Sequence, residues 1–168
     1  MILSVLILAL VTAQRLGELV VARRNTRRLL AEGGVECGAE HYPLMVGLHA
    51  AWLIGLWVLA WDRPANLAWA GVYVALEGLR IWVLASLGGR WTTRIIVVPG
   101  ETLVRKGPYR FLPHPNYLVV VGEIAVLPLV FGLTGYAVAF SLLNASLLWL
   151  RIRAEEEALT EAASQPLA

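Results

Sequence analysis

The stretch YPLMVGLHAAWLIGLWVLAW (Tyr42–Trp61) contains no acidic residue, no lysine and no arginine, and it is long enough to cross the hydrocarbon core of a bilayer. Pro43 suits the first turn of a helix, where its missing N–H group is not needed. The rest of the chain has the same character, since 58% of its 168 residues are hydrophobic, 15% are charged and the mean hydropathy is +0.67. This composition predicts an integral membrane protein.

Four further apolar runs accompany this one, so we expect an all-α membrane protein with a bundle of about five transmembrane helices. The length suits a single domain spanning residues 1–168. The first run has no basic segment before it, so it is interpreted as a retained helix rather than a cleaved signal peptide. The expected spans are Ile2–Ala22, Tyr42–Trp61, Ala65–Leu87, Asn116–Phe131 and Tyr136–Glu157.

Basic residues predict the orientation of this bundle, because cytoplasmic loops of membrane proteins are enriched in arginine and lysine. They cluster after the first span, after the third span and at the end of the fifth, so these parts and the C-terminus are expected in the cytoplasm. An alanine-, leucine- and arginine-rich chain with a single lysine suggests a bacterial source and thus the bacterial inner (cell) membrane. The basic residues of these segments are Arg23, Arg24, Arg27, Arg28, Arg90, Arg94, Arg105, Lys106, Arg110, Arg151 and Arg153.

Two classes of partner find no support in the sequence. The net charge of +2 is too small to favour nucleic acid binding. The single cysteine, Cys37, cannot form a disulfide within the chain, and His49 has no companion at metal-ligand spacing, so we expect no metal site. His49 is instead expected to be a hydrogen-bonded histidine in the interior of the bundle.

Charged residues inside the expected spans are costly in hydrocarbon and therefore need partners. Arg15 and Glu18, like Glu77 and Arg80, are three positions apart, so each pair lies on one helical face and is expected to neutralise itself. Glu123 has no such neighbour. Two alternatives stay open for it, a cationic ligand or an arginine on another helix.

A polar stretch, GPYRFLPHPNYL (Gly107–Leu118), interrupts the apolar pattern before the fourth span. Non-helical backbone near a membrane must be covered by protein or line a wet cavity, which predicts a cavity at the cytoplasmic face. His114 lies near the expected start of the fourth helix, where unpaired N–H groups favour an anionic group. The rings of Tyr109 and Tyr117 suit stacking on a heterocycle or contact with a cation.

A second group lies at the end of the fifth span, where Arg151 and Glu155 are four residues apart and so share one helical face. Taken alone, this spacing is typical of a weak surface ion pair on a solvated helix end.

These motifs, in this order, resemble the isoprenylcysteine carboxyl methyltransferase family of integral membrane methyltransferases. The resemblance covers about the C-terminal half of the chain. The residues that carry it are Glu101-Thr102-Leu103-Val104, Gly107-Pro108-Tyr109-Arg110, His114-Pro115-Asn116-Tyr117 and Arg151-Ile152-Arg153-Ala154-Glu155-Glu156.

The resemblance implies S-adenosyl-L-methionine as methyl donor and a lipophilic acceptor that enters from the lipid membrane. It implies that Arg151 binds and orients the acceptor and that Glu155 contacts the donor. An acceptor hydroxyl would need to lose a proton, which Glu155 or Glu156 could accept, whereas a carboxylate is already ionised near pH 7. The residues implied to bind the donor are Glu101, Thr102, Leu103, Val104, Tyr109, His114, Pro115, Asn116, Tyr117 and Glu155.

Two other functions are weighed against an O-methyltransferase. A phospholipid-type N-methyltransferase uses related motifs and the same donor, but an amine acceptor gains nothing from an adjacent arginine. A non-enzymatic membrane transporter or assembly protein is also compatible with charged residues inside the bundle. The oligomeric state is left open.

Overall fold

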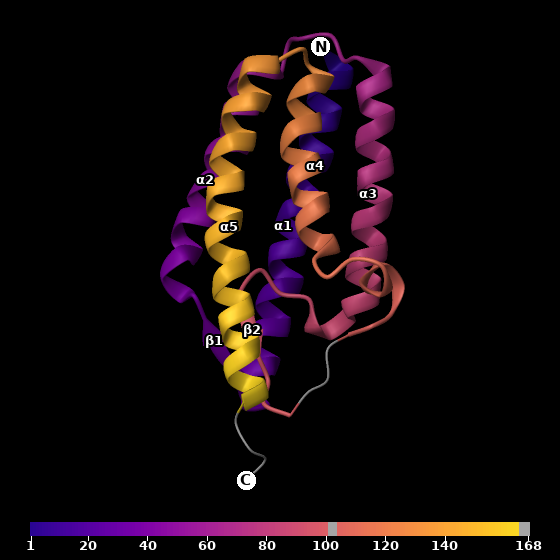
Figure 1. Cartoon of the computed structure of the whole chain (residues 1–168). Coiled ribbons are helices and arrows are strands. Elements are labelled where there is room, and N and C mark those ends of the chain that lie inside the picture. Colours follow the sequence, from indigo (N-terminus) through magenta and orange to yellow (C-terminus); the bar gives the residue numbers. More distant parts are fainter. Residues whose placement is uncertain (101–103, 165–168) are drawn as a thin grey trace.

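Five α-helices lie side by side along the long axis of the molecule, and α1 and α5 extend along most of its length (Figure 1). The computed structural model describes residues 1–100 and 104–164, with side chains through residue 158. The expected all-α membrane bundle is confirmed. The helices are α1 (Ile2–Ala31), α2 (Tyr42–Ala60), α3 (Leu67–Leu87), α4 (Pro115–Val130) and α5 (Thr134–Ser164). The shorter elements are strands β1 (Val35–Cys37) and β2 (Ile95–Val97) and the 3₁₀ turns η1 (Ala39–His41), η2 (Gly88–Arg90) and η3 (Gly107–Arg110).

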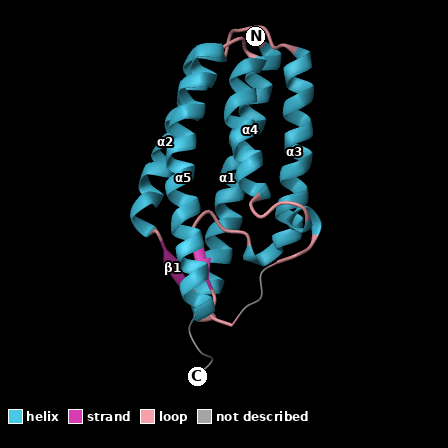
Figure 2. Ribbon diagram, in the orientation of Figure 1, coloured by secondary structure: helices cyan, strands magenta, loops and turns pink. Residues whose placement is uncertain are grey.

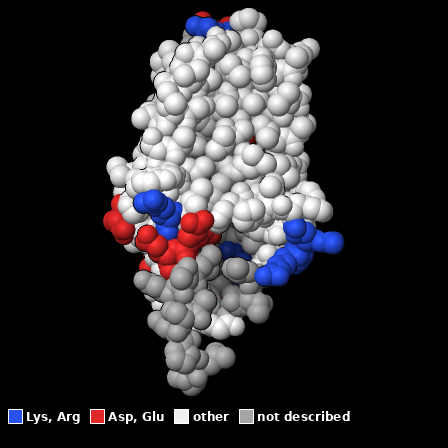
Figure 3. Space-filling view, in the orientation of Figure 1, with Lys and Arg blue, Asp and Glu red and all other residues white. Residues whose placement is uncertain are grey.

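The apolar side chains of the long helices face mainly outward. In α1, α2, α3 and α5, the most apolar window of 18 residues is only 11% to 22% buried inside the bundle. Figure 3 shows the result on one face, a broad uncharged band with charged side chains gathered at the two ends. A soluble protein would bury these residues, so this surface is suited to contact with lipid.

Helix α4 differs from the other four because it has 16 residues, compared with 30 in α1 and 21 in α3. It lies against both α3 and α5, and many of its side chains are buried. Pro128 and the turn at Gly132 end it early, since proline cannot continue the backbone hydrogen bonding of a helix. The expected span Asn116–Phe131 is therefore an apolar but short helix inside the bundle.

The end of α1 corrects the sequence analysis, which placed a basic loop after Ala22. The helix continues to Ala31 and carries Arg23 and Arg28 on its last turns rather than in a loop. Arginine has a high helix propensity, so a charged sequence does not by itself end a helix. The helix ends just before Gly33, which adopts φ = +88°.

The hydrophobic core fills the half of the bundle that contains the start of α1. It joins Leu8 of α1, Leu56 of α2, and Ile124, Leu127 and Val130 of α4. Two contacts at this end support the core. The side chain of Asn66 caps α3 by accepting hydrogen bonds from the N–H groups of Ala68 and Trp69. The backbone N–H of Asn66 donates a hydrogen bond to the carbonyl of Val130 at 2.7 Å.

A short β ribbon lies at the opposite end of the bundle, which we call the ribbon end (Figure 2). Strands β1 and β2 pair antiparallel, with Val35 opposite Val97 and Cys37 opposite Ile95. The sequence analysis did not predict these strands. Each has only three residues, and the pairing joins parts of the chain that lie on either side of α2 and α3.

The segment that follows α3 is held against α1 by one buried side chain. Asn25 is 8% exposed, and its Nδ2 donates hydrogen bonds to the carbonyl of Trp91 at 2.8 Å and to that of Gly88 at 3.3 Å. These bonds fix the path of the chain from α3 into β2. The ribbon therefore depends on Asn25 for its position.

Replacing Asn25 with alanine leaves the buried carbonyl of Trp91 and the carbonyl of Gly88 without their donor, so we expect a loss of about 1–3 kcal/mol in the free energy of unfolding. The midpoint of thermal unfolding in detergent measures this. Arg24→Ala, at an exposed position of the same helix, is the matched control and is expected to change the free energy by about 0.5 kcal/mol or less. Equal midpoints for the two variants would contradict the role of Asn25.

Candidate functional site

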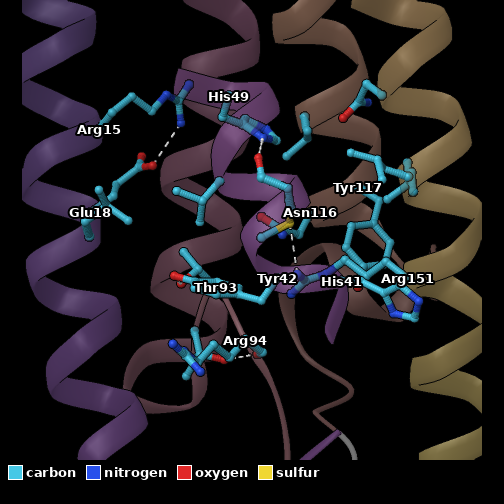
Figure 4. A pocket seen from close by; sticks show the side chains of 18 of the residues that line it. Arg15, Glu18, His41, Tyr42, His49, Thr93, Arg94, Asn116, Tyr117 and Arg151 are labelled. Atoms are coloured by element: carbon cyan, nitrogen blue, oxygen red, sulfur yellow. Dashed lines mark hydrogen bonds and ion pairs between the residues drawn. The ribbon is translucent and has the colours of Figure 1, made fainter. Parts of the chain in front are cut away.

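A cavity of about 340 Å³ lies between the hydrophobic core and the ribbon end. All five helices contribute to its wall, and α3 does so through Arg80. Residues of β1 and of the segment 91–95 complete the wall. Figure 4 shows Arg15, His49, Tyr117 and Arg151 arranged around this space. The volume lies within the range of about 300–1,000 Å³ that is typical of small-molecule sites.

A chain of three polar side chains lies where α4 and α5 meet at this cavity. The Nε atom of Arg151 donates a hydrogen bond to the hydroxyl of Tyr117 at 3.0 Å, and that hydroxyl donates in turn to Oε2 of Glu155. The guanidinium carbon of Arg151 also lies 5.8 Å from the centre of the Tyr117 ring. The i, i+4 spacing predicted a shared face for Arg151 and Glu155, and the hydroxyl of Tyr117 joins them on it.

His114 extends this chain at the start of α4. The residue is the N-cap of the helix, as expected, and Pro115 is its first residue. The His114 ring stacks on Tyr117 with 5.3 Å between ring centres and 21° between planes, and its Nδ1 lies 3.8 Å from Oε2 of Glu155. Asn116, in the first turn of α4, lines the cavity.

Tyr109 is positioned by the turn η3, which lies against α3. Gly107 allows this approach because it has φ = +58° and because a Cβ atom there would lie 2.0 Å from Oγ of Ser86. Burial, assisted by the nearby charge of Glu155, raises the pKa of Tyr109 to about 12. The Tyr109 hydroxyl therefore keeps its proton at physiological pH and remains a hydrogen-bond donor.

The structure thus separates the expected site residues into two adjoining groups. The expected donor residues Asn116 and Tyr117 line the cavity together with Arg151, which was expected to bind the acceptor. Tyr109, His114 and Glu155 adjoin the cavity without belonging to its wall. Pro115 is buried in α4, and Val104 is half-buried away from the lining. Three of the expected residues lie outside the described part of the chain: Glu101, Thr102 and Leu103.

At its inner end the cavity borders a network of charged side chains from α1, α3 and α4. Arg15 lies 2.8 Å from Glu18, 2.9 Å from Glu123 and 3.6 Å from Glu77. The Nε of Arg80 donates to Glu123 at 2.6 Å, its Nη2 also bonds to Glu123, and its Nη1 lies 3.1 Å from Glu18. The network contains three carboxylates and two guanidinium groups.

This arrangement resolves one open alternative and corrects one expectation. Glu123 pairs with Arg15 of α1 and Arg80 of α3, so its partner is an arginine on another helix, one of the two alternatives left open by the sequence. Arg80 was expected to pair with Glu77 on its own helix, but it bonds to Glu123 and Glu18 instead. Both residues of the expected pair face the interior, where oppositely charged groups on neighbouring helices lie closer than the next turn of the same helix.

Several residues of the cavity come from α2 and were not identified as site residues from the sequence. The Sδ atom of Met45 lies 3.0 Å from Nη1 of Arg151. Tyr42 holds the ribbon, because the Arg94 guanidinium lies 4.2 Å from its ring centre and its hydroxyl is 3.2 Å from Oγ1 of Thr93. Arg94 also pairs with Glu36 of β1 at 2.6 Å. Nothing in the spacing of these residues indicated that they would meet.

Comparison with known proteins places these observations in context. Residues 69–161 match the model of the Isoprenylcysteine carboxyl methyltransferase (ICMT) family. The uncharacterized protein YpbQ of Bacillus subtilis is 40% identical over 161 residues, which cover 93% of this chain and 96% of that protein. An uncharacterized protein of Haemophilus influenzae is 24% identical over 160 residues, with 90% and 92% covered. No solved structure matches the chain.

Glu123→Gln removes the charge that accepts two hydrogen bonds from Arg80 and leaves Glu18 as the carboxylate bonded to it, so we expect a loss of about 1–3 kcal/mol in the free energy of unfolding. Unfolding in detergent, followed by circular dichroism, measures this loss. The control is Glu32→Gln, which breaks the exposed pair of Arg28 and Glu32 and is expected to cost at most about 1 kcal/mol. A Glu123 variant as stable as the Glu32 variant would show that the buried network is dispensable for folding.

Proposed function

This chain belongs to the isoprenylcysteine carboxyl methyltransferase family, and from that premise we propose that it transfers a methyl group from S-adenosyl-L-methionine to an oxygen atom of a lipophilic acceptor. Family membership implies a membrane methyltransferase. The identity of the donor as S-adenosyl-L-methionine and of the accepting atom as oxygen is what we propose. The observation that carries it is the bonded chain Arg151–Tyr117–Glu155 at a cavity inside an apolar bundle.

The side chains beside the cavity fit the chemistry of this donor. When bound, S-adenosyl-L-methionine supplies a methyl group on a positively charged sulfur atom. Glu155 offers a carboxylate for a cationic group, and the Tyr109 hydroxyl offers a hydrogen-bond donor. The stacked rings of His114 and Tyr117 offer a flat surface for a heterocycle. We therefore assign the holding of the donor to Tyr109, His114, Asn116, Tyr117 and Glu155.

Arg151 is the residue that we assign to the acceptor. Its Nε is engaged by Tyr117, and its Nη1 faces the sulfur of Met45, a weak acceptor that an oxygen ligand can displace. A guanidinium group binds a carboxylate or an oxyanion through paired hydrogen bonds. Arg151 would orient the acceptor oxygen while Tyr117 holds the guanidinium group in place.

The apolar surroundings of the cavity contribute to the reaction through the exclusion of water. An oxyanion and a sulfonium ion lose their opposite charges as the methyl group moves between them. A dry site favours this loss of charge, and holding the two reactants in line removes part of the entropic cost. We propose that a lipophilic acceptor reaches this site from the bilayer, since the outward-facing apolar surface of the bundle is suited to contact with lipid.

We also propose that the ribbon end, with the C-terminus, lies in the cytoplasm of a bacterial cell membrane. Most of the basic residues lie on the parts of the chain near this end, which the preference for basic residues in cytoplasmic loops assigns to that side. A water-soluble methyl donor would then reach the site from the cytoplasm. Accessibility labelling of single cysteines placed at Arg24 or at Arg63, each in a chain with Cys37→Ser, tests this orientation in intact cells.

The direct test of the function is incubation of the purified protein with methyl-labelled S-adenosyl-L-methionine and a panel of lipophilic carboxylic acids, phenols and enols. We expect label in an ester or an ether. Label in a methylammonium product would support a phospholipid-type N-methyltransferase instead. Absence of donor binding in calorimetry would support a non-enzymatic membrane protein and would contradict the proposal.

Arg151→Ala removes the group that orients the acceptor, so we expect kcat to fall by about 100-fold while the Kd of the donor changes by less than about threefold. Turnover with labelled donor and calorimetry with unlabelled donor measure the two quantities. Arg153→Ala is the matched control, because Arg153 is exposed on the same helix and stacks on Trp149. Wild-type turnover in the Arg151 variant would remove this residue from the mechanism.

Glu155→Gln and Tyr109→Phe each remove one polar group assigned to the donor, so we expect the Kd of S-adenosyl-L-methionine to rise by about tenfold in each, or about 1.4 kcal/mol. Calorimetry on the folded variants measures this change. Glu157→Gln, an exposed position on the same helix, serves as the control. Unchanged affinity in both variants would contradict the assigned donor site.

A further inference from the structure

His49 is a titratable side chain that lines the cavity and that the proposed function has not used. It lies on α2, is half-buried, and its Nδ1 is 2.8 Å from the carbonyl oxygen of Met45 (Figure 4). A carbonyl oxygen can only accept, so Nδ1 carries the proton in this bond. In a neutral imidazole the other nitrogen, Nε2, then has a free lone pair.

Among the described residues, the ring of His49 is hydrogen-bonded through Nδ1, and no hydrogen bond of Nε2 is found. The position of His49 relates it to Arg151. Met45 lies one helical turn before His49, on the same face of α2, and its sulfur contacts Nη1 of Arg151. An acceptor oxygen held by Arg151 in place of the Met45 sulfur would therefore lie beside the face of α2 that also carries His49.

The inner network of charged side chains lies beyond His49. His49 interacts electrostatically with Arg15, Arg80 and Glu123 of the inner network. That network has one more carboxylate than guanidinium groups, counting Glu18, Glu77 and Glu123 against Arg15 and Arg80.

We propose that His49 is the general base that removes the proton from a hydroxyl acceptor during methyl transfer. The acceptor O–H bond breaks and its proton passes to Nε2 of His49. The acceptor oxygen forms a bond to the methyl carbon of the sulfonium donor, and the electron pair of the broken carbon–sulfur bond stays on sulfur. The proton later leaves His49 for water.

This inference rests on the proposed function and narrows its acceptor. A carboxylate needs no base, and it would bring another negative charge toward a network that already has an excess of one. A phenol or enol with a tyrosine-like pKa of about 10 is mostly protonated at neutral pH and needs a base. The geometry therefore assigns His49 to a weakly acidic hydroxyl rather than to a carboxylic acid. His49 also replaces Glu155, which bonds to Tyr117, as the proton acceptor.

The test compares two acceptors that differ only in acidity, a long-chain alkylphenol or cyclic enol that the wild type methylates and its electron-poor analogue that is ionised at the assay pH. For His49→Gln we expect kcat/KM to fall by about 100-fold or more on the weakly acidic acceptor and by less than threefold on the ionised one. The glutamine keeps a donor for the Met45 carbonyl but has no basic nitrogen. Acceptor affinity, measured without donor by tryptophan fluorescence, is expected to change by less than threefold.

Two controls separate proton transfer from a structural role. His41→Gln alters another histidine of the same cavity wall, and the ratio of the two kcat/KM values is expected to change by less than twofold. Thermal unfolding midpoints identify variants that fold poorly. If His49→Gln is one of them, the dependence of wild-type kcat/KM on acceptor acidity tests the inference without a variant. If its kcat/KM across a series of acceptors were proportional to the ionised fraction of each, no base would be involved and the inference would be wrong.

The remaining outcomes distinguish this inference from the proposed function. An equal loss on both acceptors, or no loss on either, would overturn the role of His49 while methyl transfer to oxygen stood. A wild type that methylates carboxylic acids but no hydroxyl would do the same. A wild type that methylates no oxygen acceptor would refute the proposed function and the inference with it.

Discussion

The buried pairing of Arg80 with Glu123 is the interaction on which the other features of the site depend. It joins α3 to α4, and through Glu18 and Arg15 it reaches α1, so it fixes three helices at one depth in the bundle. The hydrophobic core lies on one side of it and the cavity on the other. Charges in this position are stable only when their partners are placed accurately, which makes the floor of the cavity rigid.

The two ends of the cavity differ in chemistry because different helices close them. The inner end is bordered by ionic groups that bind one another. The ribbon end is bordered by Tyr117 and Arg151, whose bonds with Glu155 link α4 to α5. The wall between them is largely contributed by α2, which carries both Met45 and His49. A ligand there meets polar groups at its ends and apolar surface along its length.

The sequence predicted the helices, the family and the shared face of Arg151 and Glu155, because hydropathy and motif spacing are local properties. It did not predict the partner of Arg80, because the relative rotation of α3 and α4 is not encoded in the spacing of either helix. The end of α1 was misplaced for a related reason, since arginine is common both in basic loops and in helices. The contact of Met45 with Arg151 depends on packing across the whole bundle.

The short length of α4 has a consequence for where the two reactants meet. Its 16 residues rise about 24 Å, roughly 6 Å less than the thickness of a hydrocarbon core. The C-terminal end of α4 is bonded to the start of α3 through Asn66 and Val130. The difference in length therefore lies at the other end of α4, at His114. A water-soluble donor would thus pass below the lipid headgroups to reach the start of α4, whereas a lipophilic acceptor would remain within the hydrocarbon layer.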